Sequence, residues 1–402
     1  MEERHFPGGG NTKRPSIELL DRLIAAPLTQ LFVCGRSGSM VLHALLDGHP
    51  EILQVPHTFK FYDFLSSHPD FEAMSGANLA NAFVDYPGHA ALFDSLKSVL
   101  LNGRVGISRD VHVLIDKTSF RDVMAELLPT EGNDARRILV SVVLAYSWCI
   151  GVDPDSARHI FVHVHHGAWL WPQAVEGPCD FPGIELSQGL GWLRPERLII
   201  TARNPVAQIR SLEEFVRKAV ESPAEWDGWE ETYMRLLVQD WLRVELAQKS
   251  GIDVAVVKLE NLQADMSGQL DHLCEWMGVA PQSLHLKTPT VFGLPWWGDT
   301  YSTPSLKLNP PKAIAAPSYR NTKHFFVYLG AGEVIIREGY PAMKLFDWVL
   351  RYIGVPLLAL LYLCWKDDAV RDWRLRWSRL RFVFRVRKRH RKVLASFRAS
   401  PS

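Results

Sequence analysis

Cysteine is scarce in this chain of 402 residues, which contains five, and no two of them form a C-x-x-C pair. They are odd in number and widely spaced, at positions 34, 149, 179, 274 and 364. Neither a disulfide framework nor a zinc site built on paired cysteines is predicted, and a reducing compartment fits this usage best.

The sequence also lacks a secretory signal and a long apolar run. Residues 1–15 are charged and glycine-rich, without the apolar stretch that a secretory signal needs. The uncharged run at 352–365 has 14 residues and is interrupted by Gly354 and Pro356, whereas a membrane-spanning helix needs about 20 apolar residues. We therefore expect a cytoplasmic protein in which 352–365 forms a buried or interfacial segment.

Net charge is nearly absent, at +1, but the charges are unevenly distributed. Residues 366–402 contain 13 basic and 3 acidic side chains, which leaves 32 basic and 41 acidic ones in residues 1–365. The apolar fraction of 47% and the charged fraction of 22% argue against disorder, a collagen-like rod and a polytopic membrane protein. The pattern predicts a mildly acidic globular body with a strongly basic tail.

Three regions are predicted along the chain: a flexible lead at 1–16, an α/β domain at 17–344 and a tail at 345–402. Five short β-rich runs separated by helical segments favour a parallel sheet with helices on both faces, a three-layer α/β fold. The runs are Leu31–Cys34, Val111–Ile115, Ile160–Val164, Arg197–Ala202 and Asp253–Lys258.

A glycine- and serine-rich turn follows the first of these runs and precedes a helical pattern that Gly48 ends. Backbone N–H groups and a helix N-terminus converge in such a turn and favour a bound phosphate or sulfate. The spacing and the lysine of a Walker A motif are missing, and Arg36 can supply the positive charge instead. The alternative is an ordinary strand-to-helix turn. Its residues are Gly35, Arg36, Ser37, Gly38 and Ser39.

A second candidate phosphate site begins where the run 197–202 ends. Arg203 can present a planar guanidinium to a phosphate, and Pro205 suits the first position of a helix. Ser211, eight residues after Arg203, would lie about two turns into that helix and could add a hydroxyl donor. The alternative is a surface arginine and an ordinary helical serine.

Together the two motifs resemble the sulfotransferases that use 3'-phosphoadenosine 5'-phosphosulfate (PAPS). In that family an R-S-G-[ST]-[ST] turn binds the 5'-phosphosulfate, as residues 36–40 would here, and an Arg followed by Ser eight residues later binds the 3'-phosphate. The segments 45–51 and 257–262 also resemble family motifs, so the resemblance spans about 31–279. It implies a P-loop-like fold, PAPS as the sulfuryl donor and no metal. Met40 and Lys258 depart from the family pattern, which usually has Ser or Thr and Tyr there.

The resemblance also indicates candidates for the catalytic base. His57 falls at the interval where several relatives have a glutamate, and histidine is a suitable base near neutral pH. A second candidate is the histidine cluster 163–166, in which His165 or His166 could be the base, and Arg36 would stabilise the leaving phosphate. In the family the strand end that corresponds to this cluster often carries a Lys-Thr-Pro or a histidine-rich segment. Asp116-Lys117-Thr118, at the end of another β-rich run, is a competing match to the Lys-Thr motif. The histidine cluster lacks the Cys, Asp or Glu partners of a complete metal site, so no metal is predicted.

An aromatic group stands in the long segment 281–317, which has no periodicity and is typical of a lid or binding loop. Trp296, Trp297 and Tyr301 could stack on a sugar or an aromatic acceptor, or could simply close the loop over the core. Hydroxyl acceptors of carbohydrate, lipid-linked sugar and small-molecule type stay open, with a glycan ranked first.

The basic tail has an amphipathic pattern, with Trp373, Trp377, Leu380 and Phe384 at helical intervals among arginines. Such a helix is typical of an anionic membrane surface, and we expect peripheral attachment at the cytoplasmic face of a membrane through 366–402. Residues 382–387 also fit a strand. An anionic glycan or nucleic-acid patch, with nucleic acid the less favoured partner, and a solvated tail are the alternatives.

Three other functions compete with sulfuryl transfer. One is a scaffold that binds PAPS, or its product 3'-phosphoadenosine 5'-phosphate (PAP), without catalysis and acts at a membrane. Another is a P-loop kinase-like phosphotransferase, for which the lysine and a metal-binding Asp are missing. The third is a serine hydrolase with Ser37 as nucleophile, but Ser39 stands where the G-x-S-x-G elbow requires glycine.

Overall fold

The computed structural model shows a chain that folds into two compact units. The first unit comprises residues 1–33, 37–202 and 247–310, and the second comprises 34–36, 203–246 and 311–402. The residues that the structure describes are 2–6, 8, 12–32, 36–56, 60–98, 101–164, 192–204, 207–208, 210–212, 214, 247–248, 250–281, 288–298 and 305.

A five-stranded parallel sheet with the strand order β3-β5-β2-β6-β7 lies at the centre of the first unit. After β2 the chain first adds β3 and β5 on one side of it, with β5 next to β2. It then adds β6 and β7 on the other side, with β6 next to β2. The expected parallel α/β architecture is therefore confirmed. The strands are β2 (Leu28–Phe32), β3 (Ile52–Gln54), β5 (His159–Val164), β6 (Arg197–Ala202) and β7 (Asp253–Lys258).

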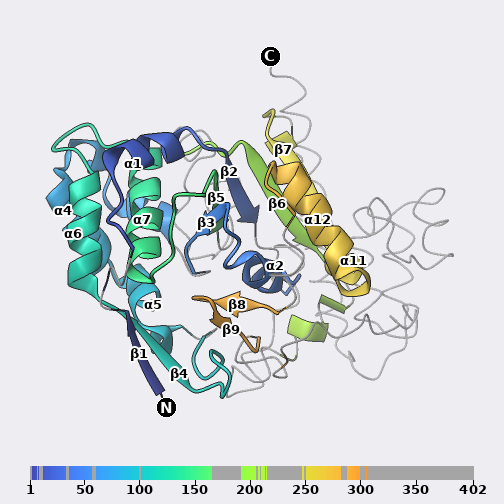
Figure 1. Ribbon diagram of the computed structural model, residues 1–402. Helices are drawn as coiled ribbons and strands as arrows, with labels where there is room; N and C mark the ends of the chain where they lie inside the picture. The colour runs from blue at the N-terminus through green and yellow to red at the C-terminus, as the bar shows by residue number, and fades with distance from the viewer. Residues whose placement is uncertain are drawn as a thin grey trace, which may run out of the picture. The chain divides into compact units, whose positions relative to one another are not determined.

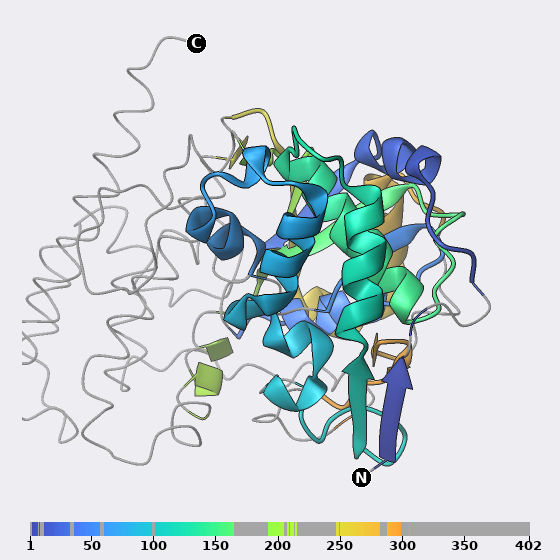
Figure 2. The ribbon, with the colours of Figure 1, turned by 90° about the vertical axis from the view of Figure 1, so that its left-hand side faces the viewer.

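Helices cover both faces of this sheet, which makes the first unit a three-layer α/β structure (Figure 1). On one side lie α1 (Ile17–Ile24), α4 (Gly76–Asp85), α6 (Lys117–Leu127) and α7 (Ala135–Cys149). On the other lie α2 (Ser39–Leu46), α11 (Leu259–Ala264) and α12 (Met266–Met277). Viewed from the side of α4 and α6, α12 is seen behind the sheet, in agreement with this division (Figure 2). Shorter helices are α3 (Phe61–Ser67), α5 (Ala90–Phe93) and the 3-10 helices η1 (Phe71–Ala73), η2 (Pro87–His89) and η3 (Ser95–Lys97).

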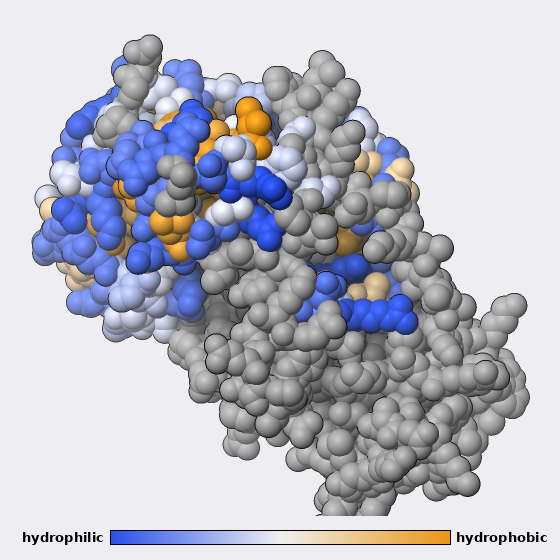
Figure 3. Space-filling view, turned by 90° about the horizontal axis from the view of Figure 1, so that it is seen from below, coloured by the Kyte–Doolittle hydropathy of each residue, from blue (hydrophilic) through white to orange (hydrophobic). Residues whose placement is uncertain are grey.

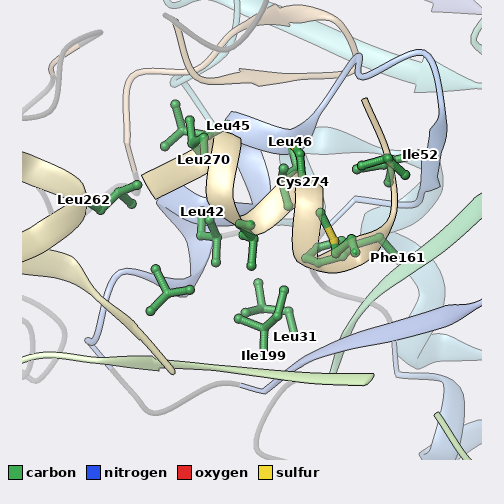
Figure 4. Packing of buried hydrophobic residues seen from close by; sticks show 14 residues of the cluster. Leu31, Leu42, Leu45, Leu46, Ile52, Phe161, Ile199, Leu262, Leu270 and Cys274 are labelled. Carbon is green, nitrogen blue, oxygen red and sulfur yellow. The ribbon is translucent and has the colours of Figure 1, made fainter. Parts of the chain in front are cut away.

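The core between the sheet and α2 fixes the position of that helix (Figure 4). Leu42, Leu45 and Leu46 of α2 are at most 1% exposed and pack in one cluster with Leu31 of β2 and with α12. Burying a leucine side chain contributes on the order of 2 kcal/mol. The helix is therefore held rigidly at the carboxyl end of the central strand. Other members of the cluster are Ile52, Phe161, Ile199, Val257, Leu262, Leu270, Leu273, Cys274, Met277 and Val279.

The carboxyl end of α2 is tied to a small hairpin formed by β8 (Thr290–Val291) and β9 (Leu294–Pro295). Asp47, the residue that ends α2, accepts a hydrogen bond at Oδ2 from the Gly293 N–H at 2.9 Å. Burial raises the pKa of this carboxyl group, and the hydrogen bond from Gly293 partly offsets that effect. Gly48 then takes a positive φ of 76°, as the sequence predicted for a residue that stops the helix.

Residues 2–6 of the lead that was expected to be flexible at 1–16 form a strand in a separate two-stranded parallel sheet. Residues Glu2–Phe6 form β1, which pairs with β4 (Val111–Ile115). Glu3 lies opposite His112 in the register, with 3.7 Å between Glu3 Oε1 and His112 Nδ1, so the two polar side chains meet across the strands. The run 111–115 is a strand as predicted, but its expected place in the main sheet was wrong. The remaining strand of the main sheet is β3, which lies beside β5. Its three residues are too few to be recognised from the sequence.

The described surface is mainly hydrophilic on the face seen in Figure 3, where apolar residues show in small groups. No helix within the described ranges is both long and apolar enough to cross a membrane. The basic tail 366–402 lies outside the described residues, so its attachment to an anionic membrane surface stays a prediction.

Candidate functional site

The turn between β2 and α2 leads from the central strand into the N-terminus of a helix. Gly38 is the N-cap of α2, with φ 96° and ψ 12°, and no side chain among the described residues caps the helix. Ser39 and Met40 form the first turn of α2. The first N–H groups of a helix have no partner within the helix, and together with the helix dipole they favour an anion. The predicted strand, turn and helix are therefore present, although Gly35 lies outside the described residues.

Close packing makes glycine necessary at position 38. A Cβ atom built on Gly38 would lie 2.8 Å from Cδ1 of Leu259, the first residue of α11. The positive φ adds a second constraint, because residues with a side chain rarely adopt it. The segment 257–262, singled out in the sequence as a late strand motif, thus begins at the end of β7 and contacts the turn at Leu259.

The hydroxyl of Ser37 points into the protein. Ser37 is 1% exposed, and its Oγ lies 2.6 Å from Oγ1 of Thr201, which is 2% exposed in β6. Ser39 is also buried, at 4% exposed. Sequence reasoning assigned Ser37 to ligand binding and missed Thr201, because only the pairing of β2 with β6 brings the two hydroxyls together.

In the second unit a helix begins directly after Arg203. Asn204 Oδ1 accepts a hydrogen bond from the Ala207 N–H at 3.3 Å, and the Gln208 N–H donates to the Asn204 carbonyl at 2.9 Å. The described residues from Ala207 onward, Ser211 included, are helical. The expected helix start at Asn204 is therefore confirmed.

Arg36, Arg203 and Ser211 lie close together within the second unit. Arg36 Nε donates to Ser211 Oγ at 3.2 Å, and Arg203 Nη1 donates to the Arg36 carbonyl at 3.4 Å. Arg36 has φ 62°, a left-handed conformation that costs a residue with a side chain on the order of 1 to 2 kcal/mol. Strained residues of this kind cluster at functional sites, and two guanidinium groups in one small region favour an anionic ligand.

The sheet register explains why these motifs begin at one edge. Within the first unit, Leu31 and Phe32 of β2 pair with Ile199 and Ile200 of β6 in a parallel ladder. The two neighbouring strands therefore end at the same edge, and the chain continues from them towards Arg36 and Arg203. In open α/β sheets this edge, where the strand order reverses direction, is where ligands bind.

The predicted histidine cluster, 163–166, begins within β5, the strand next to β2. His163 pairs with Leu31 in the register and is 1% exposed. Its ring stacks on His43 of α2, with the ring centroids 5.4 Å apart. His163 is thus a core residue that packs β5 against α2. The candidate bases His57, His165 and His166 lie outside the described residues.

The competing match, Asp116-Lys117-Thr118, follows β4 and therefore does not belong to the main sheet. Asp116 caps α6 by accepting hydrogen bonds from Thr118 and Ser119. The Lys117 ammonium lies 5.3 Å from the centre of the Phe93 ring. This match therefore does not follow a strand of the main sheet.

The two tryptophans proposed for substrate binding have different surroundings. Trp296 is 2% exposed, so its ring packs inside the protein. Trp297 is half-buried, donates from Nε1 to the Gly106 carbonyl at 2.7 Å, and has the Arg109 guanidinium 5.3 Å from its ring centre. Of this pair only Trp297 has a partly exposed ring, and Tyr301 lies outside the described residues.

Comparisons with known proteins give no family assignment. The chain matches no protein-family model, and no curated protein matches it. Among the described residues, no group of three or more His, Cys, Asp or Glu side chains is placed to hold a metal ion.

Proposed function

We propose that the protein is a sulfotransferase with a P-loop-like fold that moves the sulfuryl group of PAPS to a hydroxyl acceptor. The main support is the position of the turn before α2. It follows the carboxyl end of β2, at the point where the strand order reverses direction and where open α/β sheets bind ligands. The neighbouring strand β6 ends immediately before Arg203. The carboxyl ends of β2 and β6 are adjacent, so they suit a ligand that carries two anionic groups, one for the motif that follows each strand.

The residues present fit such a nucleotide. The N–H groups at the start of α2, from Ser39 and Met40, are suited to the 5'-phosphosulfate, and Gly38 takes the left-handed conformation from which α2 begins. Arg203 and Ser211 are suited to the 3'-phosphate as a guanidinium and a hydroxyl donor. Because these donors belong to the backbone and to Arg203, Met40 in place of a hydroxyl residue is compatible with binding.

In the proposed reaction the acceptor oxygen forms a bond to sulfur while the bond from sulfur to the 5'-phosphate oxygen breaks. The acceptor proton passes to a histidine base, and the products are a sulfate ester and PAP. The negative charge that develops on the leaving phosphate is stabilised by Arg36 and by the N-terminus of α2. A glycan is the proposed acceptor, with the partly exposed ring of Trp297 as a candidate contact.

Selective loss of PAP binding in Arg203→Ala is the expected result that tests this function. Wild-type protein should show a higher melting temperature with PAP than with ADP, which lacks the 3'-phosphate, because at equal concentration the ligand with the lower Kd stabilises the folded state more. Arg203→Ala should lose the PAP-dependent increase, about tenfold or more in affinity, since a charged hydrogen-bond pair is removed. Thermal shift titrations with both nucleotides measure this.

The matched control is Arg210→Ala, which removes an exposed arginine from the helix that follows Arg203. It should retain the PAP response. Equal stabilisation of the wild type by ADP and PAP would count against a 3'-phosphate site, and so would an unchanged PAP response in Arg203→Ala.

The base assignment is tested by alanine variants of His57, His165 and His166, with transfer of label from radioactive PAPS as the measurement. We expect His57→Ala to lose transfer while PAP still binds, because a base acts on the acceptor and not on the nucleotide. Loss in His165→Ala or His166→Ala with normal transfer in His57→Ala would move the assignment to the segment after β5. Binding of PAP by the wild type without transfer to any acceptor would support the scaffold instead.

A further inference from the structure

Thr201 contacts the turn before α2, the first of the two motifs on which the proposed nucleotide site depends. It is the fifth residue of β6 and stands two residues before Arg203. Its hydroxyl lies 2.6 Å from the Ser37 hydroxyl in the turn before α2, and both residues are at most 2% exposed. A hydrogen bond therefore joins β6 to the turn inside the protein.

The turn lies beyond the part of the backbone ladder that the structure describes. Within that part, the pairing of β2 with β6 extends to Phe32 and Ile200, and Ser37 stands five residues beyond Phe32. The turn also packs against Leu259 of α11, whose Cδ1 would lie 2.8 Å from a Cβ atom at Gly38. An apolar contact with Leu259 and a hydrogen bond to Thr201 thus both contribute to holding the turn.

We infer that Thr201 is a positioning residue for nucleotide binding and acts through Ser37. This inference rests on the proposed function. By fixing Ser37, Thr201 holds the N–H donors at the start of α2 in place on the strand β6. These donors are the ones proposed for the 5'-phosphosulfate, so the affinity for the nucleotide depends on this hydrogen bond.

Two substitutions at position 201 separate the effect of the hydroxyl from that of the side-chain volume. Valine has nearly the shape of threonine and suits a strand equally well, so Thr201→Val removes the hydroxyl with little change in volume. Thr201→Ser keeps the hydroxyl and removes a methyl group. Calorimetric titration with PAP should show about tenfold weaker binding by Thr201→Val, the size expected for one buried hydrogen bond, and binding near that of the wild type by Thr201→Ser.

A double-mutant cycle assigns the effect to the pair. Ser37→Ala should weaken PAP binding about as much as Thr201→Val, and the double variant should bind no more weakly than either single variant, because all three lack the same hydrogen bond. In transfer assays Thr201→Val should raise the KM for PAPS and leave kcat unchanged. The melting temperature of each variant without nucleotide separates lost stability from lost affinity.

Different results would overturn the two proposals separately. If the wild type binds PAP and Thr201→Val binds it equally well, the positioning role is wrong while the proposed function stands. If Thr201→Val and Thr201→Ser lose affinity equally, or melt lower with unchanged affinity, position 201 has only a structural role. If Thr201→Val does not fold, Ser37→Ala removes the same hydrogen bond, and PAP affinity equal to that of the wild type in Ser37→Ala would refute the positioning role. A wild type that does not bind PAP would remove both proposals.

Discussion

Gly38→Ala should weaken PAP binding by about 100-fold and abolish measurable sulfuryl transfer, while the first unit stays folded. The φ of 96° at Gly38 costs an alanine on the order of 1 to 2 kcal/mol. The new methyl group would also lie 2.8 Å from Cδ1 of Leu259, which is 8% exposed and has little room to move. The turn must shift to relieve both effects, and each 1.4 kcal/mol of lost interaction corresponds to a tenfold loss of affinity.

The chain offers a matched control at the other end of the same helix. Gly48 also has a positive φ, 76°, but a Cβ atom there would meet nothing within 4 Å. Gly48→Ala should therefore lower the free energy of unfolding by about 1 kcal/mol and leave PAP affinity unchanged. Calorimetric titration gives the affinities, and chemical denaturation gives the stabilities.

A second variant separates contact from backbone strain. Leu259→Ala removes the side chain that the new methyl group would meet, so Gly38→Ala combined with Leu259→Ala should regain part of the lost affinity. The remaining deficit measures the strain at position 38. Wild-type affinity in Gly38→Ala, or an equal loss in Gly48→Ala, would show that the turn is not the nucleotide site.

Local signals in the sequence were enough to predict the elements around the turn. Apolar spacing at 41–46 and the glycine at position 48 predicted α2, which the structure shows as Ser39–Leu46. Strand propensity likewise predicted the runs that became β5, β6 and β7. The order of the strands in the sheet was not predictable in this way, because it depends on contacts between residues far apart in the chain. For that reason 111–115 was assigned to the wrong sheet, although its strand structure was correct.

The same distinction holds for the candidate site. Arg36, Arg203 and Ser211 were found from their spacing, but their hydrogen bonds to one another were not, since these bonds join residues more than 160 positions apart. The pairing of Ser37 with Thr201 was missed for the same reason. His163 illustrates the opposite error. The histidines beside it in the sequence suggested a catalytic role, whereas its position in β5 buries its ring against His43.

Acid should destabilise the protein steeply below pH 6.5, because three buried histidines resist protonation. Burial lowers the pKa of His43 to about 4, that of His89 to about 4 and that of His159 to about 3, from an ordinary value of 6.5. For His159 the positive charges of Arg197 and Arg136 act in the same direction. Hydrogen bonds to backbone carbonyl groups partly offset the effect of burial for His89.

The direction of the effect follows from proton linkage. Above pH 6.5 these histidines are neutral in both states and exert no pH-dependent effect. Below pH 6.5 the unfolded chain binds protons that the folded protein does not accept until about pH 4 or lower, so stability falls as the pH falls. Each histidine contributes up to about 1.4 kcal/mol per pH unit, and three together contribute about 4 kcal/mol per pH unit near pH 5. A domain stable by about 5 to 15 kcal/mol should therefore lose much of its stability by that pH.

Chemical denaturation at pH 7.5, 6 and 5 measures this dependence, and His43→Phe isolates one contributor. Phenylalanine keeps a ring beside His163 and Phe161 but does not titrate, so the loss of stability between pH 7.5 and 5 should be smaller by about 2 kcal/mol. Leu45→Val, in the same helix and core, should lower stability at every pH and leave the slope unchanged, because it removes packing without removing a titrating group. An identical slope in His43→Phe and the wild type would mean that His43 accepts its proton in the folded protein as readily as in the unfolded chain. The packing of α2 against β5 would then open to water at acid pH without unfolding of the domain.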